Sequence, residues 1–353
     1  MTMRRVSIGF LAALGLAFAP AGATPDQDFQ ARCQSAGVLR CIGFDQASDV
    51  AGGWGSNTGV LAGTVAPTLD ATVKASGASA LKFVIASQSG AGYSGSYFAN
   101  FSADNMTQFG ENSTFYVQWR QRFSSEFLNT VFTGADGWKQ DIIGTGDKPG
   151  CSNSNLSLCN SSCSTLEVVN VNTYGRGLAH MYNSCTGSTS HGPYSPLDEP
   201  YGQYDFKLQN ARPSPYCLYS QRNTSFFPPT GNCFGYFPNE WMTFQVSITT
   251  GPRVADEFVN SRIRLWIARD GQPAELVMDR YPYNLSAGSA ADNEKYGKVW
   301  LLPYNTNKNP AQVHPTGYTW YDELIISTQR IPDPGAGSGP TNPPPPPPNV
   351  RVN

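Results

Sequence analysis

A row of polar side chains runs along the segment Phe115–Phe123, which reads FYVQWRQRF. With the period of two that a β-strand imposes, one face carries Tyr116, Gln118, Arg120 and Arg122, and the other carries Phe115, Val117, Trp119, Gln121 and Phe123. A guanidinium pairs bidentately with planar anions, so such a row is suited to a sugar that bears a carboxylate or a sulfate. The alternative is an ordinary solvated sheet face.

Three later segments repeat this alternation. Met242, Phe244, Val246 and Ile248 oppose Trp241, Thr243, Gln245 and Ser247; Ile263, Leu265 and Ile267 oppose Arg262, Arg264 and Trp266; Lys298, Trp300, Leu302 and Tyr304 share one face. Aromatic rings stack on the apolar faces of sugar rings, and planar polar groups bind hydroxyls and carboxylates. These faces are therefore candidate sugar-binding surfaces, with tryptophans of an ordinary core as the alternative.

Short alternating segments separated by turn residues predict an all-β protein. The strands we expect are Ala80–Ser87, Phe115–Phe123, Lys139–Gly144, Leu166–Asn172, Leu178–Asn183, Trp241–Thr250, Arg262–Arg269, Lys298–Tyr304 and Tyr318–Ser327. The helical segments we expect are Asp26–Gln34 and a turn at Ala103–Phe109. The segment His191–Phe237 is rich in Pro, Tyr, Asn and Ser and predicts a long excursion from the same domain.

The ends of the chain indicate export. Residues 1–23 combine a basic start, a short apolar run and a small-residue cleavage site, which predicts a bacterial signal peptide and a secreted or periplasmic location. Residues 24–334 then form one β domain, and residues 335–353 a Gly/Pro-rich tail or linker. No segment is long and apolar enough to span a bilayer.

The charge of the chain argues against nucleic acid as a partner. Without Arg4 and Arg5 the mature part has 22 basic and 26 acidic residues, a net charge of −4, whereas nucleic-acid binding requires a basic footprint. We expect a monomer.

Eight cysteines lie in the mature part: Cys33, Cys41, Cys151, Cys159, Cys163, Cys185, Cys217 and Cys233. An even number in an exported chain predicts four disulfides. Nearness in sequence favours Cys33 with Cys41 and Cys217 with Cys233, and it leaves the other four around one loop. A zinc site is the alternative, but the irregular spacing does not favour it.

The layout resembles that of a known family. An early strand reads YVQWRQRF, a strand containing Lys139-Gln140 follows, and the closing strand reads YDELIIS. Over Gly53–Pro334 this order resembles the jelly-roll polysaccharide lyases, in particular the heparin-lyase-I-like and the glucuronan- or alginate-lyase-like groups. The resemblance implies a concanavalin A-like β-jelly-roll sandwich with few short helices, a concave groove, and β-elimination on a uronate-containing polysaccharide.

Elimination requires a group that neutralises the uronate carboxylate, a base for the C5 proton and an acid for the leaving oxygen. Arg120 and Gln118 are the candidates for the first role, and His180 and Tyr182, which share a face of LAHMYNSC, for the other two. A structural His180 is the alternative. Tyr304, His314 and Tyr318 are further candidates for proton transfer or binding, and Arg122, Lys139, Gln140, Arg264, Trp266, Lys298 and Trp300 for substrate binding. The Gln-x-His motif of alginate-lyase-like enzymes is replaced by Gln140-Asp141-Ile142.

Two other functions remain open. Glycoside hydrolases of this shape carry paired carboxylates on one strand face, and no such spacing occurs; Asp322 and Glu323 are adjacent and are expected on opposite faces. A lectin-like binding module would use the same aromatic faces without catalysis. No cofactor is required, although structural Ca²⁺ at Asp136, Asp141, Asp147 or Asp322 is an option.

Overall fold

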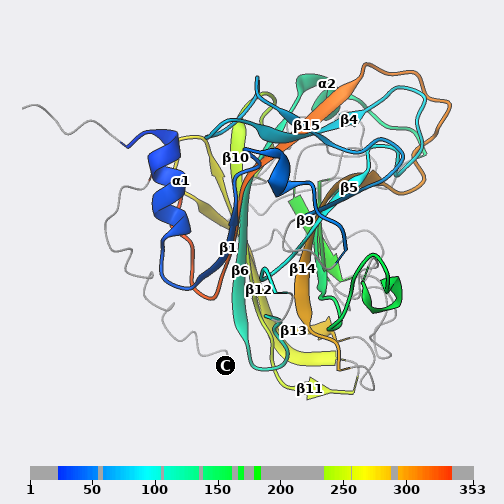
Figure 1. Cartoon of the computed structure of the whole chain (residues 1–353). Coiled ribbons are helices and arrows are strands. Elements are labelled where there is room, and N and C mark those ends of the chain that lie inside the picture. Colours follow the sequence, from blue (N-terminus) through cyan, green and yellow to red (C-terminus); the bar gives the residue numbers. More distant parts are fainter. Residues whose placement is uncertain are drawn as a thin grey trace, which may run out of the picture.

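The chain folds into two antiparallel β-sheets that pack face to face (Figure 1). The computed structural model describes residues 23–54, 59–104, 107–134, 138–160, 166–170, 179–183, 234–255, 257–287 and 293–335. Within these residues the all-β jelly-roll sandwich expected from the sequence is confirmed.

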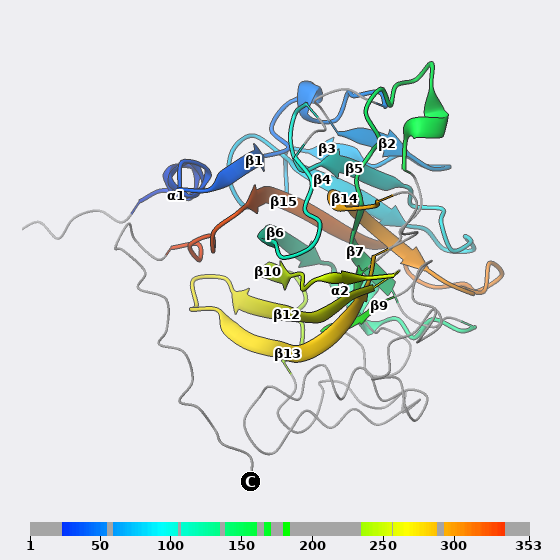
Figure 2. The same ribbon diagram turned by 90° about the horizontal axis from the view of Figure 1, so that it is seen from below.

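Sheet A is the larger layer, and its described part has nine strands. In spatial order the main path is β11 (Arg253–Val254), β12 (Glu257–Arg269), β10 (Trp241–Thr249), β6 (Thr114–Phe123), β15 (Gly317–Ser327), β4 (Ala80–Ile85) and β3 (Thr68–Asp70). In addition β1 (Val38–Ile42) pairs with β15, and β13 (Glu275–Ser286) pairs with β12. Figure 2 shows β13, β12, β10, β6 and β15 side by side.

Sheet B faces sheet A across the core, and its described part has six strands. Their order is β2 (Val60–Ala62), β5 (Ser96–Asn100), β14 (Tyr296–Asn305), β7 (Trp138–Thr145), β8 (Leu166–Asn170) and β9 (Ala179–Asn183). We call the face of each sheet that turns away from the other sheet its outer face.

The core lies between the two sheets and confirms the predicted alternation. Phe115, Val117, Trp119, Gln121 and Phe123 of β6 are all at most 1 % exposed. They meet the apolar rows of β10 and β12 and, from sheet B, residues such as Val299 and Leu301 of β14. The period of two therefore identified the inward face of each of these strands.

In the described part of the chain two short α-helices accompany the sheets. Helix α1 (Pro25–Cys33) begins with a capping box, in which Thr24 Oγ1 accepts from the Gln27 amide and Gln27 Oε1 accepts from the Thr24 amide, and Pro25 sits at a helix start where its missing N–H costs nothing. This helix lies against the outer face of sheet A (Figure 1). Helix α2 (Ser125–Asn129) directly follows β6. The short 3₁₀ helices are η1 (Ala47–Asp49) and η2 (Leu156–Leu158).

The described segments confirm the nine predicted strands, with ends shifted by a few residues and β12 extended back to Glu257. The helix Asp26–Gln34 is confirmed as α1. In the predicted turn at Ala103–Phe109, Ala103 and Asp104 lie in a turn, and Phe109 forms an isolated β-bridge with Tyr296; residues 105 and 106 lie outside the described residues. Residues 191–233 of the predicted excursion lie outside the described residues.

Two disulfides occur in the described residues. Cys33 is bonded to Cys41, as predicted, and Cys151 is bonded to Cys159, which the sequence left open. Cys163, Cys185, Cys217 and Cys233 lie outside the described residues. Disulfides of this kind are typical of an oxidising compartment. None of the helices described is long and apolar enough to cross a membrane.

Candidate functional site

The outer face of sheet B brings together several residues that the sequence singled out. Trp300, Leu302 and Tyr304 of β14 share this face, as their spacing predicted. Phe98 of β5 and Ile142 of β7 join them in an apolar cluster. The middle of this face is therefore apolar, and its chemistry must come from the two ends of the strands.

One end of the face carries a lysine beside a tyrosine. Lys139 of β7 and Tyr304 of β14 are cross-strand partners, and the Lys139 Nζ lies 5.8 Å from the centre of the Tyr304 ring. Both residues are half-buried. An ammonium group and a phenol at this spacing can act on one ligand, the first by charge and the second by proton transfer.

The strand pairing extends this row toward the histidine candidate. Lys139 pairs with Val169 of β8, and Val169 pairs with His180 of β9. Ala179 and Met181, which flank His180, belong to the core between the sheets. Since successive residues of a strand alternate between faces, His180 and Tyr182 occupy positions on the outer face of sheet B. Tyr304, Lys139 and His180 therefore belong to one row across the sheet.

The opposite end of the face contains Trp54, which sequence reasoning missed. Its ring lies 5.4 Å from the Phe98 ring and 4.7 Å from the Nζ of Lys298, and its backbone amide donates to Asn153 Oδ1 over 3.0 Å. Trp54 is half-buried and lies outside the strands. No period-of-two pattern could have identified it, because it precedes β2 in a loop.

The burial of Lys298 contradicts the prediction that this residue contacts the substrate. It is 1 % exposed, and its ammonium is hydrogen-bonded to the Asp147 carboxylate and to the carbonyl oxygen of Asn160. Trp300, on the same face, is 5 % exposed. The ammonium of Lys298 is thus enclosed by protein and is not available to a polymer.

The arginine row of β6 lies on the other side of the molecule, on the outer face of sheet A. Arg120 is only 6 % exposed; it forms an ion pair with Asp270, and its Nη1 lies 3.7 Å from Glu323 Oε1. Arg32 of α1 binds the same Glu323. The structure therefore does not bring Arg120 together with His180. The prediction that these strand faces line one shared groove is wrong.

The glutamines on the outer face of sheet A form hydrogen bonds with other parts of the protein. Gln118 is fully buried; its Oε1 accepts from Arg32 over 2.9 Å, and its Nε2 donates to the carbonyl of Pro332 over 3.2 Å. Gln245 exchanges two hydrogen bonds with the backbone of Ile331, over 2.9 and 3.0 Å. Residues 329–335, which we call the strap, thus cross the outer face of sheet A. These contacts correct the prediction that Gln118 meets a sugar.

The remaining sheet A candidates are engaged with neighbours. Arg264 lies 3.5 Å from the Asp279 carboxylate, the Trp266 ring is covered at 5.1 Å by the guanidinium of Arg330, and the Tyr318 ring by the Lys82 ammonium at 4.7 Å. Arg122 is half-buried on the same face, beside Trp241 and Trp320 in the strand register. None of these residues joins the row of Tyr304 and Lys139.

Gln140 points into the core, which contradicts the prediction that it binds substrate. A β-bulge between Lys139 and Asp141 in the pairing with β8 breaks the alternation. Gln140 is 1 % exposed; its Nε2 donates to Gln121 over 2.8 Å, and its Oε1 accepts from the Tyr236 hydroxyl over 2.5 Å. Sequence alternation alone places Gln140 opposite Lys139 but cannot show that Asp141 then also turns inward.

The aspartates proposed as calcium ligands do not lie together at one site. Asp141 is buried in the sandwich, where burial raises the pKa of its carboxyl well above the usual range. Asp322 accepts from the amides of Ala75 and Ser76, whereas Asp147 binds Lys298. The described residues contain no group of three metal-ligating side chains, and Asp136 lies outside them.

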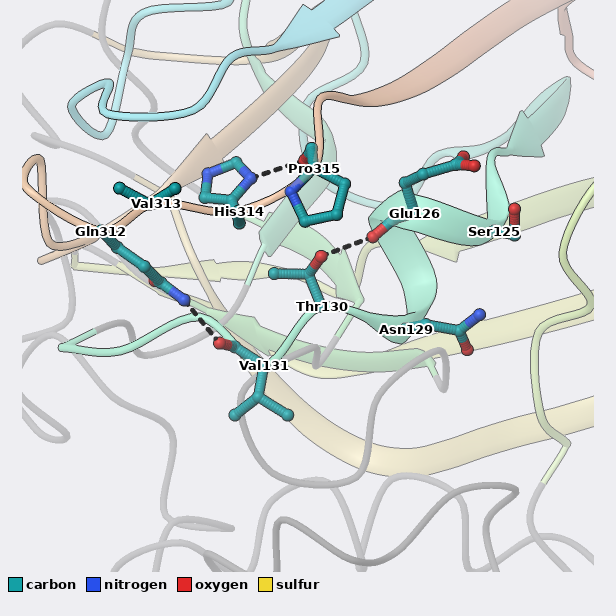
Figure 3. Close-up of a pocket in the computed structure, with 9 residues that line it drawn as sticks. All are labelled: Ser125, Glu126, Asn129, Thr130, Val131, Gln312, Val313, His314 and Pro315. Atoms are coloured by element: carbon teal, nitrogen blue, oxygen red, sulfur yellow. Dashed lines mark hydrogen bonds between the residues drawn. The ribbon is translucent and has the colours of Figure 1, made fainter.

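His314 lines a shallow depression of about 410 Å³ beside α2 (Figure 3). Its Nδ1 lies 2.7 Å from the carbonyl oxygen of Pro315, to which it donates a hydrogen bond. The ring packs edge-on against Phe132. His314 is thus held by its own loop, away from the row of Tyr304 and Lys139 in the pairing of the strands.

The class that the described residues define is an antiparallel two-sheet β-sandwich of the jelly-roll type. No family model and no curated protein matches the sequence.

Solved structures with a similar fold include three lyases. A marine PL-14 alginate lyase from Aplysia kurodai has a TM-score of 0.46 and 10 % identity, over 74 % of this chain and 87 % of that chain. An endo-β-1,4-glucuronan lyase from Trichoderma reesei has a TM-score of 0.41 and 14 % identity, over 83 % and 96 %. The alginate lyase vAL-1 from a Chlorella virus has a TM-score of 0.38 and 10 % identity, over 74 % and 89 %. The similarity is one of fold alone.

Proposed function

We propose that this protein is an exported polysaccharide lyase that cleaves a uronate-containing polysaccharide by β-elimination on the outer face of sheet B. The observation that carries the proposal is the Lys139–Tyr304 pair, with its 5.8 Å separation, in one row with the position of His180. A positive charge next to a proton-transferring phenol matches the two demands of the reaction.

In the proposed reaction each group has one role. The Lys139 ammonium pairs with the uronate carboxylate and makes the C5 proton more acidic, because negative charge develops toward that carboxylate. Tyr304 and His180 are the proton-transfer groups: one takes the proton from C5, and the other protonates the glycosidic oxygen as the C4–O bond breaks. The products are a new reducing end and a sugar with a C4=C5 double bond. Trp54, at the far end of the face, supplies a ring for stacking against a neighbouring sugar.

The test is an ultraviolet assay for the unsaturated product with alginate, glucuronan and glycosaminoglycans. The Tyr304→Phe variant removes only the phenolic oxygen, so we expect activity to fall by about 10²–10⁴-fold with an unchanged thermal unfolding midpoint. Tyr281→Phe is the matched control, because Tyr281 is 65 % exposed on β13 of sheet A and should keep full activity. Full activity in the Tyr304→Phe variant would contradict the assigned role.

A lectin-like function is the second candidate, and the half-buried Trp54 ring at one end of the face favours it, because aromatic rings stack on the apolar faces of sugars. Binding on a glycan array without any unsaturated product would select this function. New reducing ends without unsaturation would instead indicate a hydrolase.

A further inference from the structure

A lysine, an asparagine and an aspartate meet at the end of sheet B that is remote from Tyr304. Lys298 of β14 and Asn100 of β5 are direct cross-strand partners. Directly opposed residues on one face of an antiparallel pair have Cβ atoms roughly 4.5–5.5 Å apart. Asp147, just after β7, lies against both side chains. The three residues therefore form one compact group.

The three side chains are enclosed by protein. Lys298 and Asp147 are each 1 % exposed, and Asn100 is 8 % exposed. The Trp54 ring lies 4.7 Å from the Lys298 Nζ. Burial against this ring and the absence of water-facing surface lower the pKa of Lys298. A larger fraction of the amine is therefore neutral, and only the neutral amine is a nucleophile.

Asp147 bridges the other two groups with its two oxygens. Oδ1 accepts from the Lys298 ammonium and, over 2.7 Å, from the amide of Asn160. Oδ2 accepts from the Nδ2 of Asn100 over 2.8 Å. The Lys298 Nζ also donates to the Asn160 carbonyl over 2.6 Å. One carboxyl group is thus in contact with both an amine and a side-chain amide.

One atom of this group has no partner among the described residues, namely the buried Oδ1 of Asn100. A buried carbonyl oxygen without a donor is costly, and such an atom calls for an explanation. Because an ion pair between Lys298 and Asp147 would be complete without Asn100, the ion pair does not explain why this amide is buried here.

We propose that Lys298 and Asn100 form an intramolecular isopeptide bond with Asp147 as the proton-transfer group. The lone pair of the neutral Nζ attacks the Cγ of Asn100, whose Oδ1 takes up the developing charge. Asp147 takes the proton from Nζ and gives a proton to Nδ2, which leaves as ammonia. An N–C bond forms, an N–C bond breaks, and no oxidant or reductant is needed. The product is an amide that joins β14 to β5.

The test is the mass of the mature protein after reduction and denaturation. The proposal expects a mass lower than that of the sequence by one ammonia. Trypsin should then fail to cut after Lys298, and residues 83–120 should appear joined to residues 296–308, since these are the peptides that its cuts at Lys82, Arg120, Lys295 and Lys308 define. An unmodified mass would overturn the proposal. Loss of one water, with Lys298 joined to Asp147, would overturn Asn100 as the acyl group.

Two lysine variants separate this reaction from the general effect of a buried lysine. Lys298→Arg keeps the positive charge but has no primary amine, so the ammonia loss should disappear. Lys308→Arg is the matched control, because Lys308 is 3 % exposed, burial lowers its pKa, and it donates to the carbonyl of Ser89. This variant should retain the ammonia loss. If either arginine variant does not fold, the mass of the unsubstituted protein still decides the question.

Discussion

Arg120 shows how burial changes the meaning of a residue. Its guanidinium pairs with Asp270 and approaches Glu323, a carboxylate that is completely buried under α1. A buried charge that loses its partner is destabilising, because desolvation is no longer compensated. The structure therefore predicts a role in stability for a residue that the sequence placed in the substrate site.

Replacing Arg120 by Ala should lower the free energy of unfolding by about 3 kcal/mol, measured by urea unfolding. The matched control is Arg269→Ala, because Arg269 is half exposed in its ion pair with Glu240 and should cost about 0–1 kcal/mol. A stable Arg120→Ala protein that has lost lyase activity would instead restore Arg120 to the substrate site.

Asp141 predicts a dependence of stability on pH. Its carboxyl group is completely buried, and burial, opposed only in part by a hydrogen bond with the backbone of Ile142, raises the pKa of this carboxyl well above the usual range. The folded state keeps a proton that the unfolded chain releases above its ordinary pKa of about 3.9. The contribution is therefore favourable at low pH and is lost as the pH rises from there through the raised pKa.

An Asp141→Asn variant should remove this loss, because the amide is neutral at every pH. The measurement is the free energy of unfolding from pH 4 upward, compared with the unsubstituted protein. We expect a smaller decline in the variant; Asp322, whose pKa burial also raises, continues to contribute in both proteins. Equal slopes for the two proteins would show that Asp141 is ionised in the folded state.

The candidate site was only partly predictable at this scale. The period of two correctly grouped Trp300, Leu302 and Tyr304, because alternation follows from the geometry of a strand. It could not show which polar faces other segments cover, since that depends on contacts with residues far away in the sequence. Gln118 is covered by α1 and the strap, and Trp54 reaches the face of sheet B from a loop.

Among the elements, the strands with clean alternation were predictable, whereas several short or irregular strands were not. Strand β13 contains Pro282 and a charged pair, Asp279-Arg280, which argue against a strand in a sequence. Pro282 is tolerated because β13 lies at an edge, where, within the described residues, it pairs with β12 alone. Strands β2 and β3 have three residues each, too few for a periodic pattern.

The strap is an element without regular structure, and the buried Ile331 anchors it to the sheet. Ile331 is 1 % exposed and packs with Phe29 of α1 and Ile325 of β15. An Ile331→Ala substitution should cost about 2–5 kcal/mol in thermal or urea unfolding, because it leaves a cavity between these elements. Val313→Ala is the control, since Val313 is 76 % exposed and should have no measurable effect. A stable Ile331→Ala protein would mean that the strap adds little to the fold.

At the scale of the whole molecule, the two outer faces carry different groups. The face of sheet A carries α1 (Figure 1), the buried Arg32–Glu323 ion pair and the strap, whereas the face of sheet B carries the Tyr304–Lys139 pair. Since the core separates them, substitutions on one face should not alter the other. The stability of sheet A and the chemistry of sheet B can therefore be tested independently.

The strap and α1 also meet directly, because the Gly335 amide donates to Asp28 Oδ1 over 2.9 Å. A circular permutant that joins these two segments with a short linker and opens the exposed turn at Gly271 should fold. We expect the same β-rich circular dichroism spectrum as for the unpermuted protein. We also expect both sheets to unfold together in a single cooperative transition. Loss of cooperative unfolding would show that the fold requires an unbroken β12–β13 turn.

This meeting of the first helix with the strap has a practical consequence. A resin, an electrode or a fusion partner attached next to either segment would lie against sheet A, on the side that carries no candidate catalytic row. The immobilised protein would then present Tyr304 and Lys139 to the bulk solution, where a long polymer can approach without colliding with the support.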